Sequence, residues 1–318
     1  MSPKWSRMVL LGSLLLLGAC QIDESTTQVG LPGSGGTGSQ ITRKDGVYVT
    51  GIIQRLADGV VQVSDEVWQL TSKTQILPTD SVLQVGQVVY LRSTPERNTV
   101  QLWLRPQAQG VVEWVDTDAQ QLLIEGAVIT WTDDTIVNVG RGGLAAGQAL
   151  QVFGEITQHG IKATRIERIA ESVTPQLTLR VDGIDPTEHL ISQAGASYTY
   201  DALTSVRLPN LNQCIHAQLA PRPMPITDGL YAIASFEQDQ GLRHDASALI
   251  QGEIDSMKTP ALFQLGCYRV HTDQHTLWQK MDAQQLYNGQ AVRVEGLIRD
   301  DGALQAVYIW PVEAINMP

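Results

Sequence analysis

The amino-acid sequence predicts an all-β protein built from four small modules in a row. The clearest observation is that Leu-x-x-Gly-Gln occurs three times, at 83–87, 144–148 and 286–290, and that an alternating apolar strand follows each copy. Short β-branched runs with a period of two residues, separated by Asp-Gly turns, fill the chain from residue 46 onward. No long amphipathic helical pattern occurs among them.

The chain begins with a segment typical of a secretory signal peptide, over residues 1–19. Lys4 and Arg7 precede an apolar run at 8–17, and small residues follow that run. The run is too short to span a hydrocarbon core, which needs about 20 apolar residues. The segment Leu16-Leu17-Gly18-Ala19-Cys20 resembles the lipobox of bacterial lipoproteins. The resemblance implies that Cys20 is diacylated and anchors the mature chain to a membrane; an ordinary signal peptide is the alternative.

The residue after the lipidated cysteine directs membrane sorting, by the same resemblance. Aspartate at this position favours retention in the inner membrane of enteric-type bacteria, whereas this chain has Gln21. We therefore expect an anchor in the outer membrane, with the protein facing the periplasm.

Residues 20–45 are expected to form a flexible, lipidated tether. The stretch at 33–39 contains only glycine, serine and threonine, which supply too little apolar surface to pack. Gly33, Gly35 and Gly38 match G-x-G-x-x-G, but a dinucleotide site needs a buried strand before this motif and a helix after it. Neither is predicted here, so the match is an accident of composition.

The repeats divide the remaining chain into modules at 46–106, 107–172, 173–248 and 249–318. The spacing of their glycines supports duplication, because Gly110 precedes Gly147 by 37 residues and Gly252 precedes Gly289 by the same 37. This coincidence of spacing is typical of tandem repeats.

The third module is the divergent one. Gly183 takes the place of Gly110, and we match Gly229 to Gly289, which makes this span 46 residues. The longer span predicts a proline-rich insertion between Arg207 and Pro225, with Cys214 inside it. A specialised role is expected in this module.

Each module has the strand order of a small OB-like five-stranded β-barrel: three strands, a turn at Leu-x-x-Gly, and two more strands. The third strand carries Thr-x-x-Thr or a near version of it, and tryptophans are expected to supply much of the thin core. The threonine positions are Thr71 and Thr74, Thr132 and Thr135, Asp201 and Thr204, and Thr272 and Thr276; the tryptophans are Trp68, Trp103, Trp114, Trp131, Trp278 and Trp310.

The repeats resemble a bacterial family of unknown function, DUF5666, which recurs in tandem in secreted proteins and lipoproteins. The likeness rests on Gly110-Val111-Val112, the Thr132–Thr135 strand, Leu144-Ala145-Ala146-Gly147-Gln148, Gly154 and Ala163-Thr164-Arg165-Ile166. The fourth module resembles this family nearly as well as the second does, the first module resembles it in part, and the third poorly. This family has no assigned chemistry, so the resemblance implies a β-module and transfers no catalytic residue.

Charge and cysteine content restrict the partners. Removal of residues 1–19 leaves 20 basic and 33 acidic residues, a net charge of −13. A surface this acidic repels phosphate backbones, so nucleic acid is not expected as a partner. After lipidation of Cys20, only Cys214 and Cys267 remain. In an oxidising periplasm they pair as a disulfide or stay as two buried thiols.

The candidate chemistry is sparse. Cys267, His271 and His275 are the strongest set of metal ligands, since zinc needs three or four; turn histidines beside a structural cysteine are the alternative. Neighbouring carboxylates such as Asp182 and Asp185 can act as an acid–base pair, but Asp-Gly dipeptides are typical of turns. The sequence has no G-x-S-x-G, P-loop or H-E-x-x-H motif. No catalytic residue and no cofactor are predicted.

We expect a non-enzymatic, membrane-anchored lipoprotein of the cell envelope that binds another envelope protein or contributes to assembly. Its support is the repeated modules and the tether, because tandem modules combine weak contacts into useful avidity. The alternative is a small-ligand or metal-binding lipoprotein with its site in the third and fourth modules.

Overall fold

The computed structural model describes residues 46–200, 208–221, 230–238 and 246–312. Several expectations concern residues outside these ranges: the lipobox and Cys20, the tether, the Asp201–Thr204 pair and Gly229. The described residues contain 23 strands and one short 3₁₀ helix, and no helix among them is long and apolar enough to cross a membrane. The predicted all-β class is confirmed.

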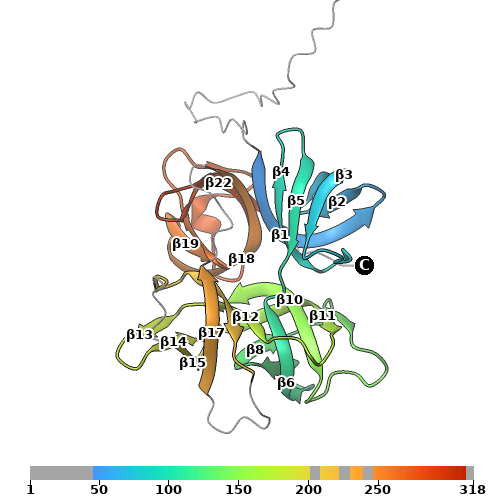
Figure 1. Cartoon of the computed structure of the whole chain (residues 1–318). Helices are drawn as coiled ribbons and strands as arrows, with labels where there is room; N and C mark the ends of the chain where they lie inside the picture. The colour runs from blue at the N-terminus through green and yellow to red at the C-terminus, as the bar shows by residue number, and fades with distance from the viewer. Residues whose placement is uncertain (1–45, 201–207, 222–229, 239–245, 313–318) are drawn as a thin grey trace, which may run out of the picture. The chain divides into compact units, whose positions relative to one another are not determined.

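The first five strands form a closed barrel, barrel 1, in the order β1-β2-β3-β5-β4 with β4 paired back to β1 (Figure 1). These strands are β1 (Val47–Ala57), β2 (Val60–Val63), β3 (Glu66–Leu77), β4 (Val88–Ser93) and β5 (Asn98–Leu104). The length of β1 permits closure: its first half pairs with β4, and after an irregularity between Ile53 and Arg55 its second half pairs with β2.

Two further rings repeat this order. In barrel 2, β6-β7-β8-β11-β10 closes on β6; in barrel 4, β18-β19-β20-β23-β22 closes on β18. The strands of barrel 2 are β6 (Ala108–Asp116), β7 (Gln121–Ile124), β8 (Ala127–Thr130), β9 (Ile136–Asn138), β10 (Ala149–Thr157) and β11 (Gly160–Arg168). Those of barrel 4 are β18 (Ser247–Thr259), β19 (Leu262–Leu265), β20 (Tyr268–His271), β21 (Leu277–Trp278), β22 (Ala291–Ile298) and β23 (Leu304–Pro311), with the 3₁₀ helix η1 at Ala283–Gln285. The predicted OB-like strand order is confirmed.

Barrel 3 has the same order, with its first strand divided in two. Its strands are β12 (Gln176–Arg180), β13 (Gly183–Asp185), β14 (Leu190–Gln193), β15 (Ala196–Tyr200), β16 (Cys214–Leu219) and β17 (Leu230–Gln238). Pairings run β12-β16-β17-β15-β14-β13, so the short link from β12 to β13 completes the ring.

The match of Gly229 to Gly289 was wrong. The Leu-x-x-Gly-Gln turn has its counterpart in barrel 3 at 209–213, where Asn212 has φ +63° in place of the glycine (φ +86° at Gly289). Gln213 Oε1 accepts a hydrogen bond from the Asn210 backbone N–H at 2.8 Å, as the motif glutamines do elsewhere. The extra length lies after the turn, between β16 (Cys214–Leu219) and β17, the last two strands, so the expectation that Cys214 lies inside the insertion was also wrong.

The repeated threonine has a defined role. Thr135 Oγ1 accepts a hydrogen bond from the Thr132 backbone N–H at 3.0 Å and donates one to the Ala163 carbonyl at 2.8 Å. Thr74 and Thr276 make the same two kinds of bond in barrels 1 and 4. One hydroxyl thus fixes this segment to the fifth strand; the segment is a turn after the third strand in barrels 2 and 4 and lies within β3 in barrel 1.

The barrels combine in two pairs: the first with the fourth, and the second with the third. Strand β1 pairs in parallel with β18, which joins barrels 1 and 4 into one 11-stranded sheet. Strand β6 pairs with β12, which joins barrels 2 and 3 into a 12-stranded sheet. The first and last modules are therefore direct neighbours.

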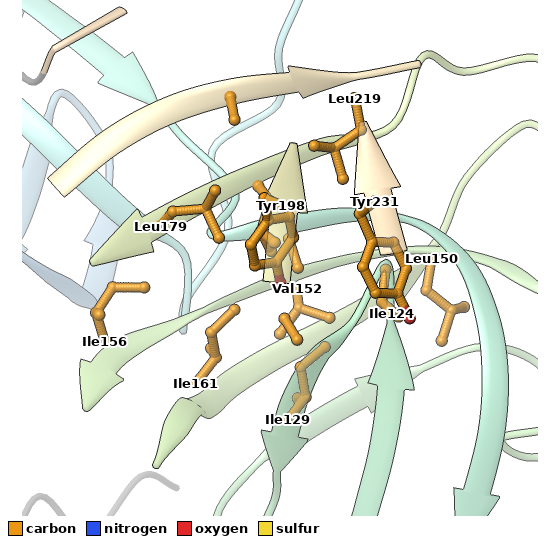
Figure 2. Packing of buried hydrophobic residues seen from close by; sticks show 14 of the residues in the cluster. Ile124, Ile129, Leu150, Val152, Ile156, Ile161, Leu179, Tyr198, Leu219 and Tyr231 are labelled. Carbon is orange, nitrogen blue, oxygen red and sulfur yellow. The ribbon is translucent and has the colours of Figure 1, made fainter. Parts of the chain in front are cut away.

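One core is shared by barrels 2 and 3. Tyr198 and Tyr231 of barrel 3 lie over Ile124 and Leu150 of barrel 2 (Figure 2). The centroids of the two tyrosine rings are 5.5 Å apart. The Tyr198 hydroxyl donates to the Glu125 carbonyl at 3.3 Å. Branched aliphatic side chains and tyrosines dominate this core.

The tryptophans contribute less to the cores than we expected. Trp68 is fully buried, but Trp114 is 39% exposed and Trp103, Trp131, Trp278 and Trp310 are half-buried. Trp114 lies near the outer end of β6, where the barrel wall faces solvent.

Candidate binding clefts

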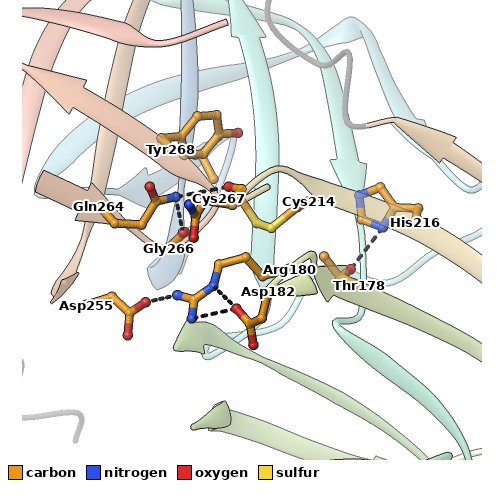
Figure 3. The surroundings of a disulfide bond; sticks show 12 residues. Thr178, Arg180, Asp182, Cys214, His216, Asp255, Gln264, Gly266, Cys267 and Tyr268 are labelled. Carbon is orange, nitrogen blue, oxygen red and sulfur yellow. Dashed lines mark hydrogen bonds and ion pairs between the residues drawn. A yellow bond between two sulfur atoms is a disulfide. The ribbon is translucent and has the colours of Figure 1, made fainter. Parts of the chain in front are cut away.

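Cys214 and Cys267 form a disulfide. The alternative of two buried free thiols is therefore wrong. Cys214 begins β16 in barrel 3, and Cys267 lies in the turn between β19 and β20 in barrel 4 (Figure 3). Their Cα atoms are 5.3 Å apart and their sequence separation is 53. The bond therefore joins two barrels covalently.

A buried ion pair lies beside the disulfide. Arg180 at the end of β12 pairs with Asp255 of β18, and both side chains are more than 90% buried (Figure 3). The other carboxylate oxygen of Asp255 accepts a hydrogen bond from the Gln158 backbone N–H at 2.5 Å. Since Gln158 belongs to barrel 2, one carboxylate connects barrels 2, 3 and 4.

The neighbouring carboxylates singled out in the sequence have structural roles. Asp182 accepts hydrogen bonds from Arg180 at 3.3 Å and from the Ala194 backbone N–H at 2.8 Å. Asp185 accepts from two backbone N–H groups of the following turn, at 2.9 and 3.1 Å. Asp185 thus caps a turn, as interpreted, but Asp182-Gly183 is not an Asp-Gly turn, because Gly183 begins β13 and has no positive φ.

The zinc hypothesis loses its thiolate ligand, because Cys267 is held in the disulfide. His271 lies on β20, and burial together with Arg299 and Arg269 lowers its pKa. His275 lies in the turn after β20, where its backbone N–H donates to Asp273. No three His, Cys, Asp or Glu side chains in the described ranges are placed to hold a metal ion. Of the two histidines, His275 lies in a turn and His271 on a strand, and Cys267 has a structural role in the disulfide.

The described residues enclose a cleft of about 610 Å³ among barrels 1, 2 and 4, which we call the acidic cleft. Its walls come from β1 and β4, from β10 and β11, and from β18 with the turn around Cys267. Aliphatic side chains such as Ile52, Ile156 and Leu265 form part of the lining. Cys267 of the disulfide and Asp255 also line it.

Charged side chains of three strands, β18 of barrel 4 and β10 and β11 of barrel 2, line the acidic cleft. Because side chains alternate along a strand, Gln251, Glu253 and Asp255 share one face of β18. On barrel 2, Glu155 of β10 lies opposite Lys162 of β11 in the strand register. Lys162 bridges the two barrels by an ion pair with Glu253.

Glu155 is the most perturbed group of the cleft. Burial, reinforced by the Glu253 carboxylate and opposed by Lys162, raises the pKa of Glu155 to about 7. Its carboxyl receives no hydrogen bond from the described chain, and the buried Gln251 Oε1 also has no donor there. The cleft thus contains acceptors that the described protein leaves unsatisfied.

Sequence reasoning missed Glu155, Lys162 and Glu253. Alternating polar residues at 251, 253 and 255 predict an outward polar strand face. Nothing in the sequence indicated that β10 of another module faces this strand, because that arrangement follows from how the barrels pack.

A second cleft, of about 860 Å³, lies among barrels 1, 2 and 3. Its walls include Trp103, Phe236 and the strongly exposed Val82 (71%). Amide side chains are frequent around it: Gln84, Gln87, Gln109, Gln151, Gln176 and Gln218. Two of these amides bond within the cleft wall: Gln151 donates to Glu167 at 2.6 Å, and Gln87 accepts from the Gln84 backbone N–H at 2.8 Å.

Comparison with known proteins agrees with the repeat analysis for two segments. Residues 109–167 and 251–309 match the family described as "Domain of unknown function (DUF5666)". These segments span most of barrels 2 and 4, so the resemblance is confirmed there. No curated protein matches the chain.

Among solved structures, one similar chain is "drosophila Unr CSD456". It is 10% identical to this chain and the alignment covers 84% of this chain and 98% of that one, with a TM-score of 0.19. A similarity this low supports no argument about function.

Proposed function

We propose that this chain is a lipid-anchored protein of the bacterial cell envelope, and that its folded region is a non-enzymatic binding or structural module. The observation that carries the proposal is the junction of barrels 2, 3 and 4, where the Cys214–Cys267 bond and the Asp255 contacts join separate modules. Covalent and buried polar links of this kind keep clefts between barrels in a fixed form, which suits binding.

The anchor is proposed from the lipobox resemblance at Cys20. The flexible tether expected over residues 20–45 would have a root-mean-square span of roughly 30 Å, and the barrels could then reach partners near the membrane surface. Metabolic labelling with an alkyne fatty acid tests the anchor. The wild-type chain should be labelled and Cys20→Ser should not; unlabelled wild type would contradict the anchor.

The binding role is tested by photo-crosslinking in intact cells. A photo-reactive amino acid at Val82, in the second cleft, should capture one envelope protein reproducibly. The matched control places it at Val67, which is 46% exposed and does not line that cleft. Equal capture from both positions, or none from either, would count against a partner in this cleft.

A small-ligand function is the second candidate, and the acidic cleft favours it. The site expected from the sequence lay in modules 3 and 4, whereas this cleft is lined by barrels 1, 2 and 4. A metal-based version is weaker, because Cys267 is not available as a ligand.

A further inference from the structure

We propose that the acidic cleft binds a small aliphatic amine, whose ammonium group lies between Glu155 of barrel 2 and the Gln251–Glu253 edge of barrel 4. This inference rests on the proposed binding function and names the ligand class for one of its clefts. It is carried by the cavity, by the placement of its carboxylates and by acceptors that lack donors.

The charges of the cleft leave one carboxylate in excess. Arg180 and the Gln158 backbone N–H engage Asp255, and Lys162 engages Glu253. The charges of Lys162 and Glu253 both act on the Glu155 carboxyl, but that carboxyl receives no hydrogen bond within the described chain. The other titratable side chains that line the cleft are Tyr90, His159 and Tyr268. A ligand cation would supply the missing charge and donors.

The available acceptors match an ammonium group. Glu155 contributes two oxygens, and the Gln251 Oε1 atom is buried without a donor in the described residues. An ammonium has three N–H donors and no acceptor. A phosphate or carboxylate ligand would instead be repelled by Glu155 and Glu253.

The remaining wall suits a methylene chain. Ile52, Val88, Ile156 and Leu265 line the cleft, and three of these four are buried in the barrels behind it. Apolar walls with a few placed polar groups are typical of small-molecule sites, and the volume of about 610 Å³ lies in their usual range. An alkyl amine uses both surfaces, whereas a bare metal ion uses only the carboxylates.

Calorimetric titration of the full chain with cadaverine (1,5-diaminopentane) tests the inference. We expect saturable binding, with release of about half a proton per ligand at pH 7, because a bound ammonium favours the ionised form of Glu155. Titration in two buffers of different ionisation enthalpy gives the proton count. The affinity should rise between pH 6 and pH 8 as Glu155 loses its proton.

Glu155→Gln keeps the shape of the side chain and removes its charge. This variant should bind cadaverine about tenfold more weakly and release no proton. Glu171→Gln, the same change at an exposed position outside the cleft, should behave as wild type. 1,5-Pentanediol, which has the same chain and no charge, should not bind.

Three results would overturn the inference: no saturable binding by wild type, unchanged affinity in Glu155→Gln, or equal binding of the diol. If Glu155→Gln does not fold, the pH dependence and proton release of wild type still decide the question. Loss of cadaverine binding alongside an intact crosslink at Val82 would reject the cleft ligand and leave the partner function standing.

Discussion

At the scale of single residues, Glu155 shows how a binding group is held at a cost in stability. Its pKa of about 7 in the folded chain lies above the ordinary value of 4.5, so the folded state binds a proton more readily than the unfolded state. The free energy of unfolding should therefore fall as the pH rises from 4.5 to 7, by on the order of 3 kcal/mol, and change little above that range.

Glu155→Gln should remove this contribution. The variant should be more stable than wild type at pH 8, and the difference should shrink toward pH 5, where the wild-type carboxyl is protonated. Urea unfolding at both pH values measures the difference, with Glu171→Gln as the control. Parallel pH profiles for wild type and Glu155→Gln would show that Glu155 is not the group responsible.

Gly154 illustrates a residue whose position was visible in the sequence but whose reason was not. Gly154 follows Gly147 by seven residues, as Gly296 follows Gly289. A Cβ atom at Gly154 would lie 2.2 Å from the Lys162 carbonyl oxygen, and one at Gly296 would lie 2.1 Å from that of Gln305. The close approach of two strands at a register shift requires glycine there, and spacing alone does not reveal that approach.

Gly154→Ala should lower the free energy of unfolding by about 1–3 kcal/mol, since the strand must move to admit the methyl group. Gly142→Ala is the matched control, because a Cβ atom there meets nothing within 4 Å. Thermal or urea unfolding measures both variants. A variant at Gly154 as stable as wild type would mean that β10 and β11 shift apart freely.

At the scale of elements, the repeated motifs predicted the strand order of the barrels correctly. They misplaced the turn of barrel 3, where asparagine replaces the motif glycine. Three copies keep glycine at the turn, but barrel 3 has Asn212, which also tolerates a positive φ. A search for glycine therefore passed over the true turn and selected Gly229. The Gln213 hydrogen bond to Asn210 identifies the turn in space.

In barrels 1, 2 and 4 the second threonine of the Thr-x-x-Thr signal bonds to the fifth strand, whereas the corresponding pair of barrel 3 lies outside the described residues. Thr135 is buried and bonds to two backbone groups, whereas the Thr132 side chain is exposed. Thr135→Val should cost about 1–3 kcal/mol, because the buried Ala163 carbonyl and the partly buried Thr132 N–H lose their partner. Thr132→Val should cost less than about 0.5 kcal/mol. Equal costs measured by urea unfolding would contradict the proposed role of the second threonine.

At the scale of the whole molecule, the sequence indicated barrels but not their neighbours. The β1–β18 pairing joins residues about 200 apart, and the β6–β12 pairing uses only two residue pairs. Such contacts depend on which strand edges remain free after each barrel closes, and local patterns carry no information about that. For the same reason the sequence did not decide whether Cys214 and Cys267 form a disulfide, and it did not predict that the bond joins barrels 3 and 4.

Removal of the disulfide by Cys214→Ser with Cys267→Ser should lower the free energy of unfolding by about 4 kcal/mol for a separation of 53 residues. Urea unfolding of the oxidised wild type, the reduced wild type and the double variant measures this loss. The reduced protein and the double variant should agree. A loss seen only in the double variant would point to the serines rather than to the missing bond.

The Asp255 junction gives a second measure of how the barrels hold together. Asp255→Asn leaves the buried Arg180 with only Asp182, at 3.3 Å, and should cost about 3 kcal/mol or more. Asp301→Asn is the control, because its pair with Arg269 is more than 40% exposed on both sides and should be worth less than about 1 kcal/mol.

The two links between barrels 3 and 4 should depend on each other. Once the disulfide is removed, barrel 3 can separate from barrel 4 more easily, so water reaches Arg180 and Asp255→Asn should cost less than it does in the oxidised protein. A double-mutant cycle over Asp255 and the cysteine pair measures this difference, which should lie between about 0.5 and 3 kcal/mol. Strict additivity would mean that the two links act independently, so that loss of the disulfide does not loosen the packing around Arg180 and Asp255.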